Sequence, residues 1–584
     1  MTTRIGTLHS LRRLFTEVPE FSAGFRVTLF TALLSTAVQV AIPIAVQQII
    51  DREILGSAGP DAAGVAALGA IAIVAVMIGV AARRATIVRL GLASARGLSQ
   101  LRIQTFGHLH KLSVLHVQAE RRGSLVSRVT SDVATIQDFM DWAGLGAITG
   151  SSQLLLALGA MFVYEWRLAA FVLTAVVVYA VLLGWFQRIL QRGHDEVRRR
   201  VADSMSRLGE AIAGIMVVRA YGAEAATSDR TDTSFASQFE AEYRTAKLGA
   251  VLFSTADLFA GLITAGVIGL GILLGDISAG TLLAFLFLAA LLVEPVQMLV
   301  EVLDVAQSAG AGMRRIQSVL DTEIDVADPG SAGQDLPDGA LGVEFDDVGF
   351  EYRPGEPVLA HVTVTIQPGA RVAVVGETGS GKTTFAKLAA RLLDATIGTI
   401  SVSGVPIRSI RFPGLRSRVG YVPQEGFLFD QSIAENVRYG RPTASDIETR
   451  AAFDDLGLGG WIDSLPDGIH TQVGEGGGQL SAGERQLIAL ARAWIADPDV
   501  LILDEATSAV DPALDVRLRR AIERLAEGRT SITIAHRLST AEASDEVLVF
   551  GHGRLVERGS HVQLLAAHGD YARLHADWVA GTTN

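Results

Sequence analysis

Six apolar stretches in the first half of the sequence restrict what this chain can fold into more than any other feature. Each is long enough, or nearly so, to cross the hydrocarbon core of a bilayer, which is about 30 Å thick and takes roughly 20 helical residues. The stretches lie near residues 25–50, 62–85, 143–164, 167–187, 248–274 and 279–300. The first half is therefore predicted to be an α-helical membrane domain with six transmembrane helices.

The connections between these stretches differ in length and charge. Those after the second and fourth stretches are long and rich in arginine, whereas the other three are short and carry mainly acids: Asp51, Glu53, Asp61, Glu165 and Asp276. Because cytosolic connections carry an excess of Lys and Arg, both termini and the second half are expected in the cytosol. The long connections are rich in helix formers, so the helices should extend beyond the membrane. A reversal in each, around 113–124 and 206–217, is either a short helix that contacts the second half or part of a solvated hairpin.

Polar side chains inside the apolar stretches are costly in lipid and indicate either a functional role or helix packing. The candidates are Gln39, Gln47, Gln48, Gln153, Asp257, Glu294, Glu301 and Asp304. Glu301 and Asp304 lie three residues apart, so one helix face carries both. A role in binding substrate or protons and a role in packing or solvation both stay open.

The composition agrees with a membrane protein of at least two domains. The chain has 584 residues, 49% hydrophobic and 19% charged, with a net charge of −12, and it is too long for a single core. It has no cysteine, which excludes disulfides and thiolate chemistry. The charge distribution gives no indication of nucleic-acid binding. The N-terminal residues lack a continuous apolar core, so no cleavable signal peptide is expected.

A change in composition separates the two halves. Residues 321–341 are acidic, rich in Gly and Pro and without helical periodicity, which is typical of a linker. Beyond them, short apolar strands alternate with helices, as in an α/β domain around a mainly parallel sheet. The predicted domains are a transmembrane domain over 1–320, a linker over 321–341 and an α/β domain over 342–584.

A glycine-rich loop follows the apolar run 371–375 and precedes a helix-forming run. It fits the pattern G-x-x-x-x-G-K-[ST] over Gly376, Glu377, Thr378, Gly379, Ser380, Gly381, Lys382 and Thr383. In that context the backbone N–H groups and the helix N-terminus can hold phosphate oxygens. Lys382 is expected to reach the β- and γ-phosphates, and Thr383 to hold Mg²⁺. A plain glycine-rich turn is the alternative if the loop is considered alone.

A second motif makes that alternative untenable. The apolar run Val500 to Leu503 ends in Asp504 and Glu505. A strand that ends in Asp supplies the carboxylate that orders Mg²⁺ through its water shell. Glu505, directly after it, is placed to polarise an attacking water. Together the two motifs predict ATP hydrolysis, so the second half is expected to be an α/β P-loop ATPase domain.

The remaining motifs resemble one family. The signature motif of ATP-binding cassette (ABC) transporters is similar to Leu480, Ser481, Ala482, Gly483 and Glu484. Further matches occur in the family's order, with Tyr352 like the aromatic residue that stacks on adenine and Gln424 like the Q-loop glutamine. Asp511 resembles the D-loop aspartate and His536 the switch histidine. The resemblance extends over essentially the whole chain, to bacterial exporter-type (type IV fold) half-transporters.

The resemblance implies roles for these residues. Thr384 and Tyr352 join the P-loop in binding nucleotide, Gln424 gives its amide oxygen to Mg²⁺, and His536 contacts the γ-phosphate. In this family the signature motif closes over ATP on a partner chain, so a dimer with ATP and Mg²⁺ is implied. Ala482 and Glu484 stand where Gly and Gln are usual. An acid near a polyanion favours a non-identical partner, although a homodimer stays open.

The expected function is ATP-driven export of a small or amphipathic substrate, such as a drug, lipid or peptide, by alternating access. The alternatives are an importer on the same fold, with a siderophore-like substrate, and a regulatory membrane protein that ATP only gates. Hydrolysis residues argue against a pure gate. The expected location is the plasma membrane of a bacterium, with several spans and a cytosolic ATPase domain. The sequence does not identify the substrate.

Overall fold

The computed structural model describes residues 13–56, 60–119, 127–275, 277–504, 512–535 and 538–582. These residues form two compact units. The first consists of residues 13–109 and 127–321, and the second of residues 110–119 and 322–582.

The first unit is a bundle of long helices. Its α-helices are α2 (Phe25–Gln48), α3 (Ala62–Leu109), α6 (Ser131–Asp138), α7 (Gly144–Tyr164), α8 (Trp166–Ala213), α9 (Ile215–Ala220), α10 (Glu224–Leu274) and α11 (Ala279–Leu320). Short helical segments precede or continue some of them: η1 (Pro19–Ser22), η2 (Ile49–Ile54) and η3 (Phe139–Ala143). In the described part of the chain, six helical stretches are long and apolar enough to cross a membrane. Each predicted apolar stretch lies within one of them, which confirms the six-helix fold class; the exact ends of the spans stay a prediction.

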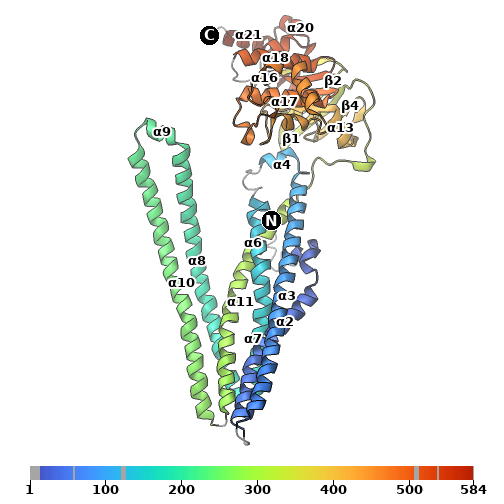
Figure 1. Ribbon diagram of the computed structural model, residues 1–584. Coiled ribbons are helices and arrows are strands. Elements are labelled where there is room, and N and C mark those ends of the chain that lie inside the picture. Colours follow the sequence, from blue (N-terminus) through green and yellow to red (C-terminus); the bar gives the residue numbers. More distant parts are fainter. Residues whose placement is uncertain are drawn as a thin grey trace. The chain divides into compact units, whose positions relative to one another are not determined.

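The membrane helices continue well past the length that a bilayer requires. Helices α3 and α8 have 48 residues each and α10 has 51, against roughly 20 for a span. Helices α8 and α10 run side by side and are joined by α9 at one end (Figure 1). The reversal overlaps the expected 206–217 only in part, because α8 continues to Ala213, is interrupted at Gly214, whose φ and ψ are −88° and 11°, and is followed by α9 up to Ala220. Gly222, at φ +60°, then allows the turn into α10.

Two apolar cores hold the first unit together. One lies between α7, α8, α10 and α11 and contains Met161, Val172 and Phe285. The other joins the N-terminal segment to α3, α6 and α11, with Phe21 packed so closely on α3 that a Cβ at Gly97 would lie 2.6 Å from its ring. The side chains that form both cores are almost fully buried.

The second unit contains two sheets in the described residues. One is antiparallel, in the order β2-β1-β4-β5, and the other has six strands in the order β10-β9-β3-β8-β7-β6. Strands β9, β3, β8, β7 and β6 pair in parallel. The strands are β1 (Val343–Arg353), β2 (Glu356–Ile366), β3 (Arg371–Gly376), β4 (Ile397–Val402), β5 (Val405–Pro406), β6 (Val419–Val422), β7 (Val500–Asp504), β8 (Thr530–Ile534), β9 (Glu546–Gly551) and β10 (Arg554–Gly559). The α/β fold class of the second half is thereby confirmed.

The second unit has helices that contact this parallel sheet and helices that pack on other helices. They are α12 (Lys382–Ala389), α13 (Phe412–Arg418), α14 (Ile433–Arg438), α15 (Asp446–Asp455), α16 (Gly459–Asp463), α17 (Ala482–Ala496), α18 (Pro512–Ala526), α19 (Leu538–Glu542), α20 (His561–Ala566) and α21 (Asp570–Thr582). Strand β7 is buried along its whole length, as parallel strands covered on both faces are. The carboxyl ends of the parallel strands share one edge of the sheet, which is where ligands bind in such folds.

Helix α4 (Val114–Ala119) belongs to the second unit although the first unit surrounds it in sequence. Leu115 packs against the core beneath the two sheets. Asp325 accepts a hydrogen bond of 3.1 Å from Ser113 Oγ and lies 3.0 Å from His116 Nδ1. The first reversal therefore holds a short helix that contacts the nucleotide half, as one of the two alternatives predicts; residues 120–124 lie outside the described part.

The segment expected to be a linker is packed on the second unit. Val326, Leu336 and Leu341 are buried, and the buried guanidinium of Arg391 donates a hydrogen bond of 2.8 Å to the carbonyl of Ala327. Its scattered apolar residues have no helical or strand period, so the sequence pattern predicts only an irregular connection. The domain limits drawn at 320 and 341 stay a prediction.

Candidate nucleotide site and membrane cavity

The glycine-rich loop lies between β3 and α12 at the carboxyl edge of the parallel sheet. Gly376, Gly379 and Gly381 have φ values of 150°, 84° and 99°, a region that favours glycine. At Gly381 a Cβ would also lie 2.6 Å from the Leu359 side chain. The loop therefore curls back over the sheet and ends at the N-terminus of α12, where unpaired N–H groups can bind an anion.

Lys382 lies across this loop. Its Nζ donates hydrogen bonds of 2.7 Å to the Gly376 carbonyl and 2.8 Å to the Glu377 carbonyl, and the residue is only 5% exposed. The buried Ser380 Oγ has no hydrogen-bond partner among the described residues. A buried hydroxyl without a partner is costly unless a ligand satisfies it. The Lys382 ammonium and the Ser380 hydroxyl fit a polyphosphate, because its oxygens can accept hydrogen bonds from both groups.

The residues for a magnesium ion meet at the ends of three neighbouring elements. Thr383 Oγ1 donates a hydrogen bond of 3.3 Å to Asp504 Oδ1, so the helix start and the end of β7 come together as the two motifs predict. Gln424 follows β6, the parallel neighbour of β7, and thus lies at the same edge. Carboxylate, hydroxyl and amide oxygens are the ligands that Mg²⁺ prefers.

Tyr421 is a site residue that the sequence motifs did not single out. Its hydroxyl donates a hydrogen bond of 2.8 Å to Asp504 Oδ2. Burial and then the nearby Asp504 carboxylate raise the pKa of Tyr421 above its ordinary value, so the phenol stays protonated and keeps donating. The hydroxyl and Thr383 therefore hold both oxygens of Asp504. The only hint in the sequence was its place three residues before Gln424.

Tyr352 contributes an aromatic face next to the loop. Its hydroxyl lies 3.0 Å from Thr384 Oγ1, and its ring meets Phe350 edge-on with centroids 4.9 Å apart. Phe350 is buried while the Tyr352 ring is partly exposed. The contacts with Phe350 and Thr384 thus position the Tyr352 ring near the start of α12.

The signature motif forms the N-terminus of α17. Ser481 is the N-cap and Glu484 the third residue of a capping box, in which each side chain accepts the other's backbone N–H. Glu484 Oε1 also accepts a hydrogen bond of 3.2 Å from Trp461 Nε1. Burial acts to raise the pKa of Glu484, but the bonds from Ser481 and Trp461 outweigh it and lower the pKa below its ordinary value. Glu484 is therefore ionised, and it is held by hydrogen bonds from Ser481 and Trp461 of its own domain.

Three predicted site residues, Glu505, Asp511 and His536, lie outside the described residues. Their described neighbours are Asp504, which ends β7, and Ala535, which follows β8. The two strands are parallel neighbours.

A cavity of about 550 Å³ opens within the first unit, between α2, α3, α7 and α11. Its lining includes Gln39, Pro43, Arg83, Gln153, Glu294 and Met298. Gln153 Nε2 donates a hydrogen bond of 2.8 Å to the Leu291 carbonyl. Three of the polar residues predicted to matter thus meet in one cavity, together with Arg83, which lies at the end of a predicted span and was missed.

The other polar residues in the spans lie elsewhere. Gln47 donates a hydrogen bond of 2.7 Å to Asp51 Oδ2 and accepts one of 3.2 Å from Tyr164, and Gln48 donates to Gln47. These four side chains form one hydrogen-bonded group at one end of the bundle. Asp257 and Glu301 are exposed, and the side chain of Asp304 lies outside the described residues.

Comparison with known proteins identifies the family. Residues 25–296 match the ABC transporter transmembrane region, and residues 359–508 match the ABC transporter domain. An ATP-dependent lipid A-core flippase of Desulfotalea psychrophila is 32% identical over 481 residues, 82% of this chain and 84% of the relative. A fatty acid ABC transporter ATP-binding/permease protein of Mycobacterium tuberculosis is 34% identical over 497 residues, covering 83% and 77%.

A solved structure of a bacterial Atm1-family ABC exporter with ATP bound superposes with a TM-score of 0.78 at 28% identity, covering 97% of this chain and 98% of that one. The chain therefore belongs to the ABC transporter family. It is a multi-pass membrane protein with an exporter fold and one ATP-binding, ATP-hydrolysing domain that drives translocation.

Proposed function

We propose that this chain, as half of a dimer, uses ATP to export an amphipathic, lipid-like substrate. The observation that carries the proposal is the membrane cavity, whose lining is mainly apolar and includes two opposite charges. Sites for small molecules are mostly apolar, with a few polar groups that fix orientation. The named activities of the relatives, a lipid A-core flippase and a fatty acid transporter, support a lipid-like substrate.

Arg83 and Glu294, the two charged residues that line the cavity, each have a role in this proposal. Arg83 lies 21 residues into α3 and Glu294 15 residues into α11, counting from Ala62 and Ala279. With a rise of about 1.5 Å per residue, Arg83 is deeper toward the cytosolic end than Glu294. Arg83 would receive an anionic head group from the inner leaflet, and Glu294 would orient a donor group on the substrate.

The ATP site would work as its geometry allows. Lys382 and the loop N–H groups bind the phosphates, Tyr352 stacks on adenine, and Thr383, Gln424 and Asp504 hold Mg²⁺, the aspartate through water. Glu505 polarises the attacking water and His536 contacts the γ-phosphate. Magnesium supplies charge neutralisation on the β- and γ-phosphates when bound.

The second chain completes each site. Ser481 and the N–H of Gly483 would close over the γ-phosphate of the partner, with the D-loop Asp511 at the same interface. The far end of the α8–α10 hairpin exposes apolar side chains, with Met216 82% and Tyr221 84% exposed. Large exposed apolar groups mark interaction surfaces. The partner's ATPase domain is the proposed cover, and the membrane is proposed to be a bacterial plasma membrane with both termini in the cytosol.

The test is ATPase turnover of the full chain purified alone in lipid. Lys382→Ala should abolish nucleotide binding, whereas Lys387→Ala, on the same helix, serves as a matched control. Glu505→Gln should keep ATP binding but lower turnover by a few orders of magnitude, the range expected when water activation is lost. Activity that is insensitive to both Lys382→Ala and Glu505→Gln would reject the mechanism.

Two further results separate the remaining alternatives. Robust turnover by the chain alone means that a homodimer suffices, whereas silence from a folded, ATP-binding chain means that a different partner is required. Direction is read in vesicles whose ATPase domains face outward: an exporter accumulates a fluorescent lipid in the lumen-side leaflet when ATP is added, and an importer does the reverse.

A further inference from the structure

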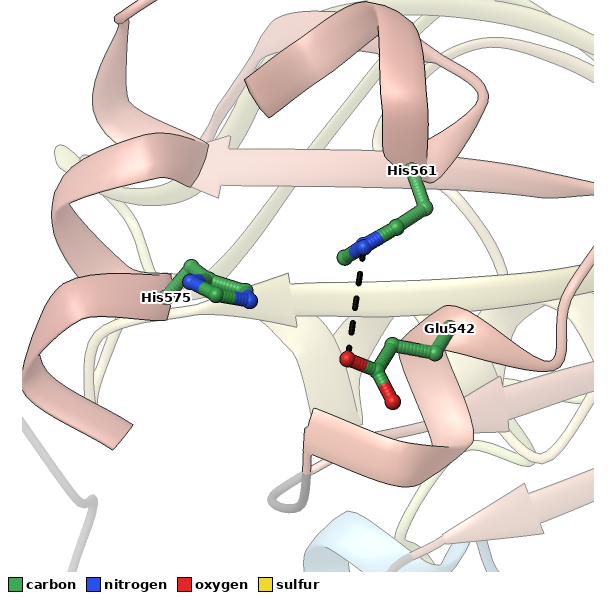
Figure 2. A group of neighbouring side chains, drawn as sticks. All are labelled: Glu542, His561 and His575. Atoms are coloured by element: carbon green, nitrogen blue, oxygen red, sulfur yellow. Dashed lines mark ion pairs between the residues drawn. The ribbon is translucent and has the colours of Figure 1, made fainter. Parts of the chain in front are cut away.

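Three side chains that the transport cycle does not use converge near the C-terminus of the chain. Glu542 ends α19, His561 begins α20 and His575 lies in α21, and Figure 2 shows all three side chains directed toward one another. Their potential ligand atoms all lie within 4.8 Å of one another. We propose that Glu542, His561 and His575 form a binding site for Zn²⁺ or a similar divalent transition metal ion.

The distances are close to those of a metal site. His561 Nε2 and Glu542 Oε1 are 4.0 Å apart, too far for a hydrogen bond. Ligands at 2.0–2.1 Å from a tetrahedral Zn²⁺ lie about 3.4 Å from each other. A closure of about 0.6 Å would bring this pair to that spacing, and the exposed Glu542 side chain has room to make it by side-chain rotation. The potential ligand atom of His575 lies within 4.8 Å of both.

The orientation of His561 is already determined. Its Nδ1 lies 2.7 Å from the hydroxyl of Tyr571, a residue that is fully buried. When Nδ1–H donates to that oxygen, the lone pair of Nε2 faces Glu542. Metal-binding histidines commonly have their second nitrogen held by such a partner, which sets the tautomer and the ring orientation.

The chemistry of the three groups selects the ion. Two imidazoles and one carboxylate, without a thiolate, suit Zn²⁺, Co²⁺ or Ni²⁺ and not the all-oxygen ions Ca²⁺ and Mg²⁺. Three protein ligands leave a fourth position for water, as in open zinc sites. The rival interpretation is a loose surface cluster of a histidine pair and an acid, in which the His561–Glu542 contact contributes little.

A metal titration of the full chain distinguishes the two. The protein is purified in lipid nanodiscs without a polyhistidine tag, stripped with a chelator and titrated with Zn²⁺ against a chromophoric competitor, and separately with Co²⁺ by visible absorption. The expected result is one tight equivalent per chain, with Co²⁺ bands of a low-symmetry nitrogen and oxygen site. Glu542→Gln and His575→Ala should each weaken binding by at least about tenfold, by analogy with the loss on mutating residues that support metal ligands.

Two further variants make the result decisive. His568→Asn removes an exposed histidine from the same region, at a backbone φ of 56° that asparagine tolerates, and should leave the titration unchanged. Glu542→His should restore binding that Glu542→Gln loses, because a third imidazole is also a zinc ligand. Circular dichroism of the metal-free variants checks folding. Equal affinity in all variants, or no equivalent bound by the native chain at micromolar Zn²⁺, overturns the proposal.

Discussion

The hydroxyl of Ser481 donates a hydrogen bond of 2.7 Å to Glu484 Oε2, and the same oxygen accepts the Ser481 N–H at 2.8 Å. The serine proposed to meet a partner's γ-phosphate is thus tied to the one acid in its motif. To reach a phosphate, Ser481 must exchange this bond for another. The pair therefore links the unusual residue of the motif to its proposed function.

Replacing Glu484 with Gln should raise ATP turnover by roughly two- to fivefold, since it removes a negative charge close to a bound polyphosphate. Glutamine at this position keeps the capping box, so α17 should remain intact. The measurement is steady-state ATPase in lipid. Glu448→Gln is the matched control, because Glu448 forms the same capping box with Ser445 at the start of α15. A turnover that falls, or that rises equally in the control, contradicts the prediction.

Tyr421→Phe should raise the Mg²⁺ concentration required for half-maximal ATPase activity by about tenfold. The variant removes the 2.8 Å hydrogen bond to Asp504, and bonds to charged groups contribute about 1.5–3 kcal/mol. Titration of activity with Mg²⁺ at fixed ATP is the measurement. Tyr439→Phe is the control, because the Tyr439 ring stacks on Phe429 at a centroid distance of 4.3 Å and that stacking survives the change. An unchanged Mg²⁺ requirement would show that Thr383 alone positions the carboxylate.

Filling the membrane cavity should separate ATP hydrolysis from its stimulation by substrate. Ala290 lines the cavity, so Ala290→Trp should abolish stimulation of ATPase by lipid-like compounds and leave basal turnover within about twofold, while Ala290→Ser should preserve both. Comparison of turnover with and without added amphipath provides the readout. Undiminished stimulation in Ala290→Trp would place the substrate elsewhere.

The ion pair between Asp132 and Arg315 should stabilise the membrane unit. The Asp132 side chain is 6% exposed and accepts hydrogen bonds of 2.9 and 3.0 Å from Arg315 Nε. Arg315→Met leaves this carboxylate without its partner, which costs about 3–5 kcal/mol for a fully buried pair and roughly 1–3 kcal/mol here, because Arg315 is half exposed. Thermal unfolding of the solubilised chain should therefore occur at a lower temperature than in the neighbouring control Arg314→Met. The additional change Asp132→Asn should recover part of the loss, and a failure to recover any would remove the ion pair as the cause.

Local patterns in the sequence were sufficient for the class of fold and for the place of the glycine-rich loop between β3 and α12. An apolar run of span length predicts a membrane helix without reference to the rest of the chain, because backbone groups in lipid must form hydrogen bonds within their own helix. The loop from Gly376 to Thr383 acts through its own backbone groups, so eight consecutive residues are enough to predict it. The reversal predicted around 206–217 overlaps the observed one only in part, because helix formers continue to Ala213 and the break depends on Gly214.

Only the tertiary structure decided which distant side chains meet. Tyr421 and Asp504 are neighbours because β6 pairs with β7, and Trp461 reaches Glu484 across the space between α16 and α17. The membrane cavity takes residues from four helices, and the cluster of Glu542, His561 and His575 takes one from each of three. No spacing along the chain encodes these contacts, because the groups lie on elements that are far apart in the sequence and that only packing brings together. The sequence by itself therefore determined the features that depend on local patterns, which are the membrane helices and the glycine-rich loop. The tertiary structure determined which side chains each functional group contacts.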